Sequence, residues 1–194
     1  MINLEMEFEA DITASLQILR NGGLILYPTD TIWGIGCDAT NPAAVEKVFA
    51  LKKRHESKSL VILLAEARDL VKYTSQPDPA IADIIDSFDR PTTIIYEGAL
   101  GMAPNVIATD GSVAIRIVKD TFCRHLIKRL RVPLVSTSAN ISGEPSPANF
   151  KEVSLAIRTG VDYIVQHRQN DLQPATASRI VRIRKDGSME IIRD

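Results

Sequence analysis

Four cationic side chains lie close together in the sequence. Lys52, Lys53, Arg54 and Lys58 fall within seven residues, at the end of an amphipathic segment. Guanidinium and ammonium groups bind phosphate oxygens and offset their charge. Cations also suit the C-terminal end of a helix, where they face the negative end of its dipole. The run is therefore either a phosphate clamp or a solvated helix end.

A hydroxyl-rich segment covers Ser136 to Pro147, with the sequence STSANISGEPSP. In an extended chain Ser136, Ser138 and Asn140 lie on one side, because alternate side chains point the same way. Hydroxyls and backbone N–H groups in such a segment can cradle phosphate oxygens. The alternative is an ordinary polar loop.

Two further patterns could serve a small polar ligand, although from pattern alone a turn at a strand edge is the favoured interpretation of the first. In the segment around Pro28 to Gly34, Thr29, Thr31 and Trp33 share a side if the chain is extended. Arg116 lies in the otherwise apolar stretch 112–118, together with Ser112 on the same side. A buried arginine needs a negative partner. That partner is either an Asp or Glu of the chain or a ligand carboxylate.

The glycines at 34 and 36 form a weak match to the dinucleotide pattern G-x-G-x-x-A, and no Walker-type phosphate loop is present. In the true dinucleotide motif the glycines open directly onto a helix. Here the best helix start, Asn41-Pro42, lies beyond them. A bend in a strand is the simpler interpretation, and a dinucleotide-binding oxidoreductase has no other support.

The elements that must position these residues alternate along the chain. Apolar periodicity and capping residues predict helices over 11–20, from Asn41 to Lys52, and over 67–73, 78–88, 121–130 and 149–158. Strands are predicted over 24–27, 60–64, 92–96, 112–118, 133–137 and 162–166, with a hairpin over 178–184 and 189–192 closed by Asp186-Gly187. This order indicates an α/β or α+β domain with a mixed sheet.

Composition limits the class of protein. The chain has 194 residues, is 45% hydrophobic and carries a formal net charge of −1, which favours one globular domain over 1–194 and argues against bulk binding of nucleic acid. Two cysteines show neither a disulfide framework nor metal-site spacing. The acidic N-terminus and the lack of a long apolar run predict no signal peptide, no membrane span and a cytoplasmic protein.

Taken together, the motifs resemble the YrdC-like threonylcarbamoyl-AMP synthase family. The resemblance rests on Tyr27 to Thr31, Gly34 to Gly36, Lys52-x-Arg54, Ser138-x-Asn140 and the segment from Ser142 to Pro147, which occur in family order. It runs from about Asn21 to the C-terminus. The combination of K-x-R with S-x-N is specific, although each motif alone would be weak.

The resemblance implies a twisted mixed sheet flanked by helices, with a large concave cavity. It also implies a nucleotidyltransferase that forms threonylcarbamoyl-AMP and pyrophosphate from L-threonine, bicarbonate and ATP, with Mg²⁺ accompanying the nucleotide. A separate complex would then transfer the threonylcarbamoyl group to adenosine in tRNA. No protein-bound metal site and no general base are expected.

The resemblance also implies roles for individual residues. Those expected to serve the chemical step are Lys52, Arg54, Ser138 and Asn140. Those expected to hold L-threonine are Thr31, Arg116 and Ser136. Those expected to bind ATP are Arg54, Lys58, Ser112, Ser138, Ser146, Ser178 and Arg193, the last two by the loosest alignment.

Several positions depart from the family pattern. His55 replaces a proline, Leu63 stands where longer relatives have a histidine, and the late segment Ala177 to Val181 is altered. A drifted paralogue is therefore one alternative. Others are a module that binds tRNA or double-stranded RNA without catalysis, and a carbamoyl-adenylate enzyme like the domain in hydrogenase-maturation proteins. Carbamoyl phosphate dependence would identify the last of these.

Overall fold

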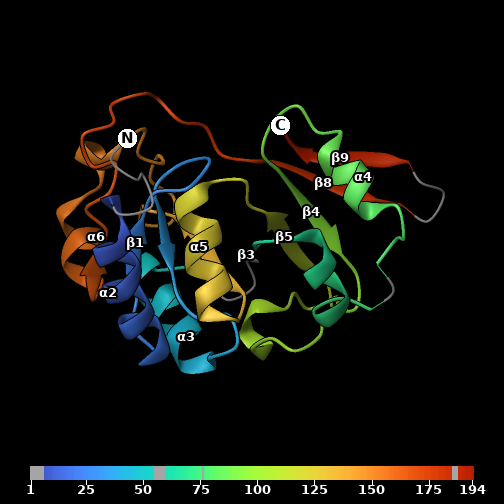
Figure 1. The fold of residues 1–194 in the computed structure, drawn as a ribbon, viewed down its shortest axis with the longest axis horizontal. Helices are drawn as coiled ribbons and strands as arrows, with labels where there is room; N and C mark the ends of the chain where they lie inside the picture. The colour runs from blue at the N-terminus through green and yellow to red at the C-terminus, as the bar shows by residue number, and fades with distance from the viewer. Residues whose placement is uncertain (1–6, 55–59, 76, 185–187) are drawn as a thin grey trace.

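The computed structural model describes residues 7–54, 60–75, 77–184 and 188–194. Helices and strands alternate as predicted (Figure 1). The α-helices are α2 (Glu9–Arg20), α3 (Pro42–Lys52), α4 (Ile81–Asp86), α5 (Thr121–Leu130) and α6 (Leu155–Gly160), and the 3-10 helices are η1 (Ala67–Lys72), η2 (Pro104–Val106) and η3 (Phe150–Glu152). The strands are β1 (Ile25–Tyr27), β2 (Gly34–Gly36), β3 (Val61–Leu64), β4 (Thr92–Tyr96), β5 (Val113–Ile117), β6 (Leu134–Ser138), β7 (Tyr163–Ile164), β8 (Arg179–Ile183) and β9 (Met189–Arg193).

One mixed sheet connects all of these strands, in the order β7-β1-β2-β6-β3-β5-β4-β8-β9. The pairs β1–β7, β3–β5 and β4–β8 are parallel, and the other neighbours are antiparallel. The sheet stays open, since β7 and β9 lie at its two ends. The predicted α/β class and mixed sheet are therefore confirmed.

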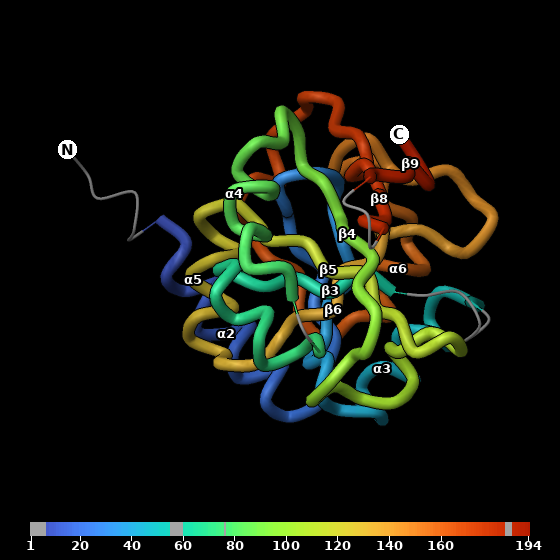
Figure 2. The backbone as a smooth tube through the Cα atoms, turned by 90° about the vertical axis from the view of Figure 1, so that its right-hand side faces the viewer, coloured from blue at the N-terminus to red at the C-terminus, as the bar shows by residue number. Residues whose placement is uncertain are grey.

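Helices cover both faces of the sheet because successive strand residues point to opposite sides. On one face, α2 and α5 pack on Ile25, Tyr27 and Leu63. On the other, α3 and α6 belong to the core that contains Leu26 and Ile62. In Figure 2 the helices α2 and α5 lie to the left of the central strands, and α3 lies below them. Within the described parts of the chain, none of the helices is both long and apolar enough to cross a bilayer.

The helix predicted over 149–158 is wrong as a single element. It divides into η3 and α6, with Val153 extended between them. The cause is Ser154, whose hydroxyl accepts a hydrogen bond from the Ile157 N–H at 3.4 Å and so starts a new helix. The predicted helix over 67–73 is the 3-10 helix η1, and the one over 78–88 shortens to α4.

The glycines of the weak dinucleotide pattern lie in β2, in line with the bend in a strand that the sequence favoured, although no strand bounds were predicted there. A Cβ on Gly36 would stand 2.7 Å from the Tyr27 ring and 3.1 Å from the Val135 carbonyl oxygen. These glycines therefore allow β2 to pack tightly beside β1 and β6, and they do not open onto a helix. The predicted C-terminal hairpin is confirmed as β8 and β9, while Asp186-Gly187 lies outside the described residues.

Candidate active site

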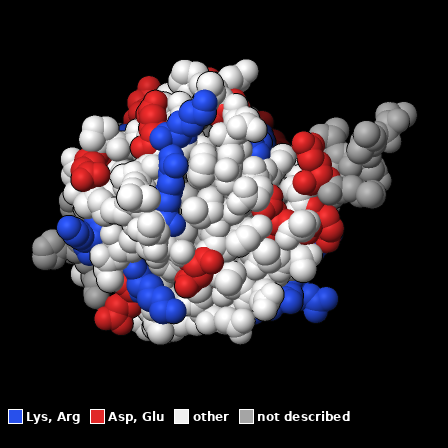
Figure 3. All heavy atoms as spheres, turned by 90° about the vertical axis from the view of Figure 1, so that its left-hand side faces the viewer, with Lys and Arg blue, Asp and Glu red and all other residues white. Residues whose placement is uncertain are grey.

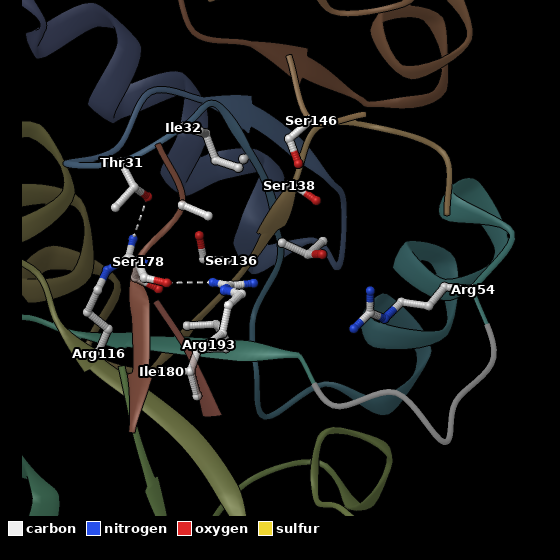
Figure 4. Close-up of a pocket in the computed structure, with 14 residues that line it drawn as sticks. Thr31, Ile32, Arg54, Arg116, Ser136, Ser138, Ser146, Ser178, Ile180 and Arg193 are labelled. Atoms are coloured by element: carbon white, nitrogen blue, oxygen red, sulfur yellow. Dashed lines mark hydrogen bonds between the residues drawn. The ribbon is translucent and has the colours of Figure 1, made fainter. Parts of the chain in front are cut away.

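A cavity of about 160 Å³ gathers residues from distant parts of the chain (Figure 4). Three guanidinium groups and four serines line it, and no Asp or Glu is found among the described residues of its wall. The lining residues are Thr31, Ile32, Gly34, Arg54, Val61, Arg116, Ser136, Thr137, Ser138, Ser146, Ala177, Ser178, Ile180 and Arg193. Such a wall favours an anionic ligand, because guanidinium groups make strong charge-assisted hydrogen bonds with carboxylates and phosphates.

The strand register explains why these residues meet. Val61 in β3 pairs with Ser136 in β6 on one side and with Ala114 in β5 on the other. Arg116 lies two residues after Ala114, so its side chain is on the same face of the sheet. The pairing of Gly34 with Ser138 brings the segment after β1 to the end of β6. The segment from β7 to β8 crosses the top of the molecule in Figure 1 and brings Ser178 to the same place.

One end of the cavity is a hydrogen-bonded group around Thr31. The Thr29 hydroxyl donates to the Ile32 carbonyl at 2.8 Å and accepts from the Thr31 N–H at 3.0 Å. The two threonine hydroxyls are 3.0 Å apart, and Arg116 Nη2 donates to Thr31 Oγ1 at 3.3 Å. Thr29 is 1% exposed, so this arrangement is fixed by buried contacts.

Arg116 has the buried acidic partner that sequence analysis offered as the simpler alternative. Its Nη2 lies 3.0 Å from Asp30 Oδ1, and the arginine side chain is only 4% exposed. The contact is an ion pair without a well-aligned hydrogen bond at Asp30 Oδ1. Arg116 Nε is also buried without an acceptor. Arg116 also lines the cavity, so its guanidinium group can meet an anion there in addition to Asp30.

Lys52 lies behind the cavity wall. Its side chain is 1% exposed, and Nζ donates to the carbonyl oxygens of Ser138 and Asn140 at 2.5 and 2.6 Å. The Lys52 carbonyl in turn accepts from the Ser142 N–H at 2.8 Å. Burial and the nearby Arg54 lower the pKa of the Lys52 ammonium to about 8. The K-x-R lysine thus fixes the path of the S-x-N segment.

Arg54 and Arg193 reach the cavity from the ends of α3 and β9 (Figure 4). Burial lowers the pKa of both guanidinium groups, and the nearby Arg116 lowers that of Arg193 further. Arg193 Nη2 donates to the Ser178 carbonyl at 2.7 Å, and the Ser178 hydroxyl lies 2.8 Å from the Thr93 hydroxyl. Neighbouring cations of one sign attract a ligand of the opposite sign.

Most of the predicted site residues lie together. Those in the cavity wall are Thr31, Arg54, Arg116, Ser136, Ser138, Ser146, Ser178 and Arg193. Lys52 and Asn140 stand just behind it. Ser112 is not part of the wall, and its hydroxyl donates to Asp110 Oδ1 at 2.6 Å. Lys58 lies outside the described residues.

Sequence analysis missed Asp30 as the partner of Arg116. The signal was present, because an arginine in an apolar strand requires an acid and Asp30 directly precedes Thr31, which was already assigned to the site. It also missed lining residues without polar side chains, such as Ile32 and Ile180, for which the sequence carries no chemical signal. Among the described residues, no group of three His, Cys, Asp or Glu side chains is placed to hold a metal ion.

Comparison with known proteins gives related sequences over nearly the whole chain. Residues 17–194 match the Sua5/YciO/YrdC family, whose description reads "Telomere recombination". The threonylcarbamoyl-AMP synthase of Coxiella burnetii (strain RSA 493) is 28% identical, over 91% of this chain and 99% of its own. That of Pseudoalteromonas translucida (strain TAC 125) is 30% identical, over 88% and 94%.

The fold is also known from crystallography. The crystal structure of P. abyssi Sua5 complexed with L-threonine superposes with a TM-score of 0.82 at 23% sequence identity. The match covers 95% of this chain and 54% of the P. abyssi chain, so this chain spans about half the length of that protein. At this identity the likeness shows a shared fold.

Proposed function

Because the chain belongs to the Sua5/YciO/YrdC family, we propose that it is a threonylcarbamoyl-AMP synthase. The observation that carries the proposal is the wall of the cavity, where Arg54, Arg116 and Arg193 surround serine hydroxyls without a neighbouring acid in the described part of the wall. Curated relatives of nearly the same length carry this name. One sheet runs through the whole chain, which supports a single domain over 1–194.

In the proposed reaction the amino group of L-threonine combines with bicarbonate to give a carbamate and water. A carbamate oxygen then forms a bond to the ATP α-phosphorus, the bond from that phosphorus to the β-phosphate oxygen breaks, and pyrophosphate leaves. Adenylate formation of this kind depends mainly on positioning and on neutralising charge. The enzyme is therefore a nucleotidyltransferase that needs no covalent intermediate.

The Thr31 end of the cavity holds the amino acid in this proposal. Arg116 binds the threonine carboxylate, because its guanidinium group lines this end of the cavity. Thr31 and Ser136 contact the remainder of the small ligand. Asp30 keeps the Arg116 guanidinium oriented when the ligand is absent.

The Arg54 end holds the triphosphate. Arg54 and Arg193 offset phosphate charge and stabilise the charge that develops on pyrophosphate, together with hydroxyls of Ser138, Ser146 and Ser178. Lys52 and Asn140 hold the Ser138 segment in place. Lys58 and Ser112 remain proposed nucleotide contacts.

Magnesium would enter as part of the MgATP substrate; among the described residues, no group of three His, Cys, Asp or Glu side chains is placed to hold it. It would neutralise charge on the β- and γ-phosphates. The product serves the modification of tRNA, and a downstream transferase complex is its consumer. The two buried, unlinked cysteines, Cys37 and Cys123, suit the reducing cytoplasm.

The test is pyrophosphate release by the purified protein with MgATP and bicarbonate. We expect release that depends on L-threonine, that L-serine at equal concentration does not reproduce, and that incorporates labelled bicarbonate into an adenylate. Carbamoyl phosphate in place of bicarbonate and threonine should give no product. Folded protein that releases no pyrophosphate would exclude the proposal.

RNA binding without catalysis is the competing function. On the face shown in Figure 3, one narrow run of basic side chains has acidic groups beside and below it, so that face does not offer a broad basic surface. Phosphate-backbone binding usually relies on clustered Lys and Arg and weakens steeply with salt. Salt-dependent tRNA affinity without ATP binding would favour this alternative.

A further inference from the structure

Arg168 has a backbone conformation that L-residues seldom adopt. Its φ is +66°, and the other non-glycine residues with positive φ in the described ranges are Lys53 and Arg131. Those two terminate α3 and α5, where a left-handed residue is common. Arg168 ends no helix, because it follows β7. It lies in the turn formed by residues 167–170, and contacts of its side chain add to the backbone hydrogen bonds of that turn.

The Arg168 side chain joins two other segments. Its Nη1 donates to Asp120 Oδ2 at 2.9 Å and to the Thr29 carbonyl oxygen at 3.2 Å. The other carboxylate oxygen of Asp120 accepts from the Cys123 N–H at 2.9 Å and so caps α5. Cys123 Sγ in turn donates to the Pro28 carbonyl at 3.3 Å. The start of the Thr29 segment is thus held from both α5 and Arg168.

The position of Thr29 determines what Thr31 offers to the cavity. The single proton of the Thr29 hydroxyl is donated to the Ile32 carbonyl, so the hydrogen bond between the two hydroxyls must be donated by Thr31. The lone pairs of Thr31 Oγ1 are then directed to Arg116 Nη2 and the cavity. If Thr29 moved, Thr31 would lose this orientation and Arg116 would lose an acceptor.

We propose that Arg168 is a positioning residue for the amino-acid end of the active site. Through the Thr29 carbonyl it fixes Thr31 and, through Thr31, the guanidinium of Arg116. The inference rests on the proposed function, since the amino-acid end is defined by it. It predicts an effect on L-threonine and none on ATP, because the Arg168 side chain donates to Asp120 and to the Thr29 carbonyl, beside the Thr31 end of the cavity.

Glycine is the best substitution for the test, because it adopts a φ of +66° without strain. In Arg168→Gly the neighbouring backbone keeps its anchor, since the buried Asp11 carboxylate accepts from the N–H groups of Gln166 and His167 at 2.9 and 2.8 Å. Arg131→Gly is the matched control, because Arg131 has the same φ and is not part of the cavity wall.

The measurements are the KM for L-threonine, the KM for ATP and the Tm of each variant. For Arg168→Gly we expect the KM for L-threonine to rise about fivefold or more, which corresponds to loss of one hydrogen bond to a charged group. The KM for ATP and the Tm should stay at wild-type values. Arg131→Gly should leave all three quantities unchanged.

A second pair of variants distinguishes loss of the ion pair between Arg168 and Asp120 from loss of stability. Asp120→Asn keeps the cap on α5, because asparagine caps helices as well as aspartate does, but removes the ion pair with Arg168. Asp120→Asn should also raise the KM for L-threonine. Arg168→Lys should raise this KM less than Arg168→Gly does. An equal rise in both KM values with a lower Tm, or no change in Arg168→Gly, would overturn the inference. Wild-type protein without threonine-dependent turnover would instead refute the proposed function.

Discussion

The two ends of the cavity are built differently. At the Thr31 end, Arg116 is 4% exposed and is already bound to Thr31 and Asp30 before any ligand arrives. At the Arg54 end, Arg54, Ser146 and Arg193 come from three separate segments, and Ser146 and Arg193 are exposed. The Thr31 end is therefore preorganised before a ligand binds. The Arg54 end consists of side chains from separate segments that line the same cavity (Figure 4).

This difference suits two kinds of ligand. A small zwitterion offers few contacts, so fixed donors are needed to tell it from similar molecules. A triphosphate offers many charged oxygens, which cations in several arrangements can neutralise. We therefore expect substitutions at the Thr31 end to act selectively on L-threonine and those at the Arg54 end to act on ATP.

The largest expected effect comes from Arg116→Ala. Loss of a buried donor to a carboxylate, with Asp30 left unpaired, should reduce kcat/KM for L-threonine about 100-fold or more. ATP affinity, measured by calorimetry, should stay within about twofold of wild type. Arg182→Ala is the control, because Arg182 lies in β8, separated from β5 by β4, and is not part of the wall. Equal loss of both ligands would remove the distinction between the two ends.

Lys52→Met should lower stability as well as activity. It leaves the carbonyl oxygens of Ser138 and Asn140 without their donor, which should cost about 2 kcal/mol of unfolding free energy. Urea denaturation measures the loss. If stability is unchanged, Lys52 does not hold the S-x-N segment.

The same pair of proteins gives a pH test. The folded-state pKa of Lys52, about 8, lies below the ordinary lysine value of 10.5. Between these values the unfolded chain binds more protons, so the stability of the wild type should rise with pH relative to Lys52→Met. We expect a gain on the order of 1 kcal/mol or more across this window. A difference that stays constant from pH 7.5 to 10 would contradict the lowered pKa.

Arg54→Ala should act on the nucleotide alone. Removing one of several cations near the phosphates should raise the KM for ATP about tenfold, and the KM for L-threonine should change little. Lys53→Ala is the matched neighbour, since Lys53 is exposed and is not part of the wall. A rise in the KM for L-threonine as large as that for ATP would show that the two ends are not separate.

Ser112→Ala should have the smallest effect. The Ser112 hydroxyl is already donated to Asp110, and the residue directly precedes β5, four positions from Arg116 and roughly 13 Å away. We expect less than about a threefold change in the KM for ATP, about the effect of one weak neutral hydrogen bond. A larger change would extend the nucleotide site along the sheet to this residue.

The sequence by itself determined much of this protein. Short apolar runs predicted most strands, Asn41 marked the start of α3, and the order of elements indicated a mixed sheet. Residue types alone raised the cations at 52–58, Arg116 and the hydroxyls at 136–147 as candidates, because charged and hydroxyl groups in apolar surroundings need a ligand or partner. Ser178 and Arg193 came only from the family resemblance. The sequence patterns predicted one helix over 149–158, but the Ser154 side chain starts a new helix inside this range. They gave no strand bounds for β2, because its sequence Gly-Ile-Gly contains a single β-branched residue, Ile35.

Only the tertiary structure determined which of these groups face the cavity and which support its wall. Lys52 and Arg54 are two residues apart in one motif, yet one is buried behind the wall and the other faces the cavity. The pairing of Arg116 with Asp30 and the reach of Arg168 to Thr29 join residues 86 and 139 positions apart. No local pattern encodes such contacts, because they depend on strand order and register, which the sheet fixes only when all of its strands pack together.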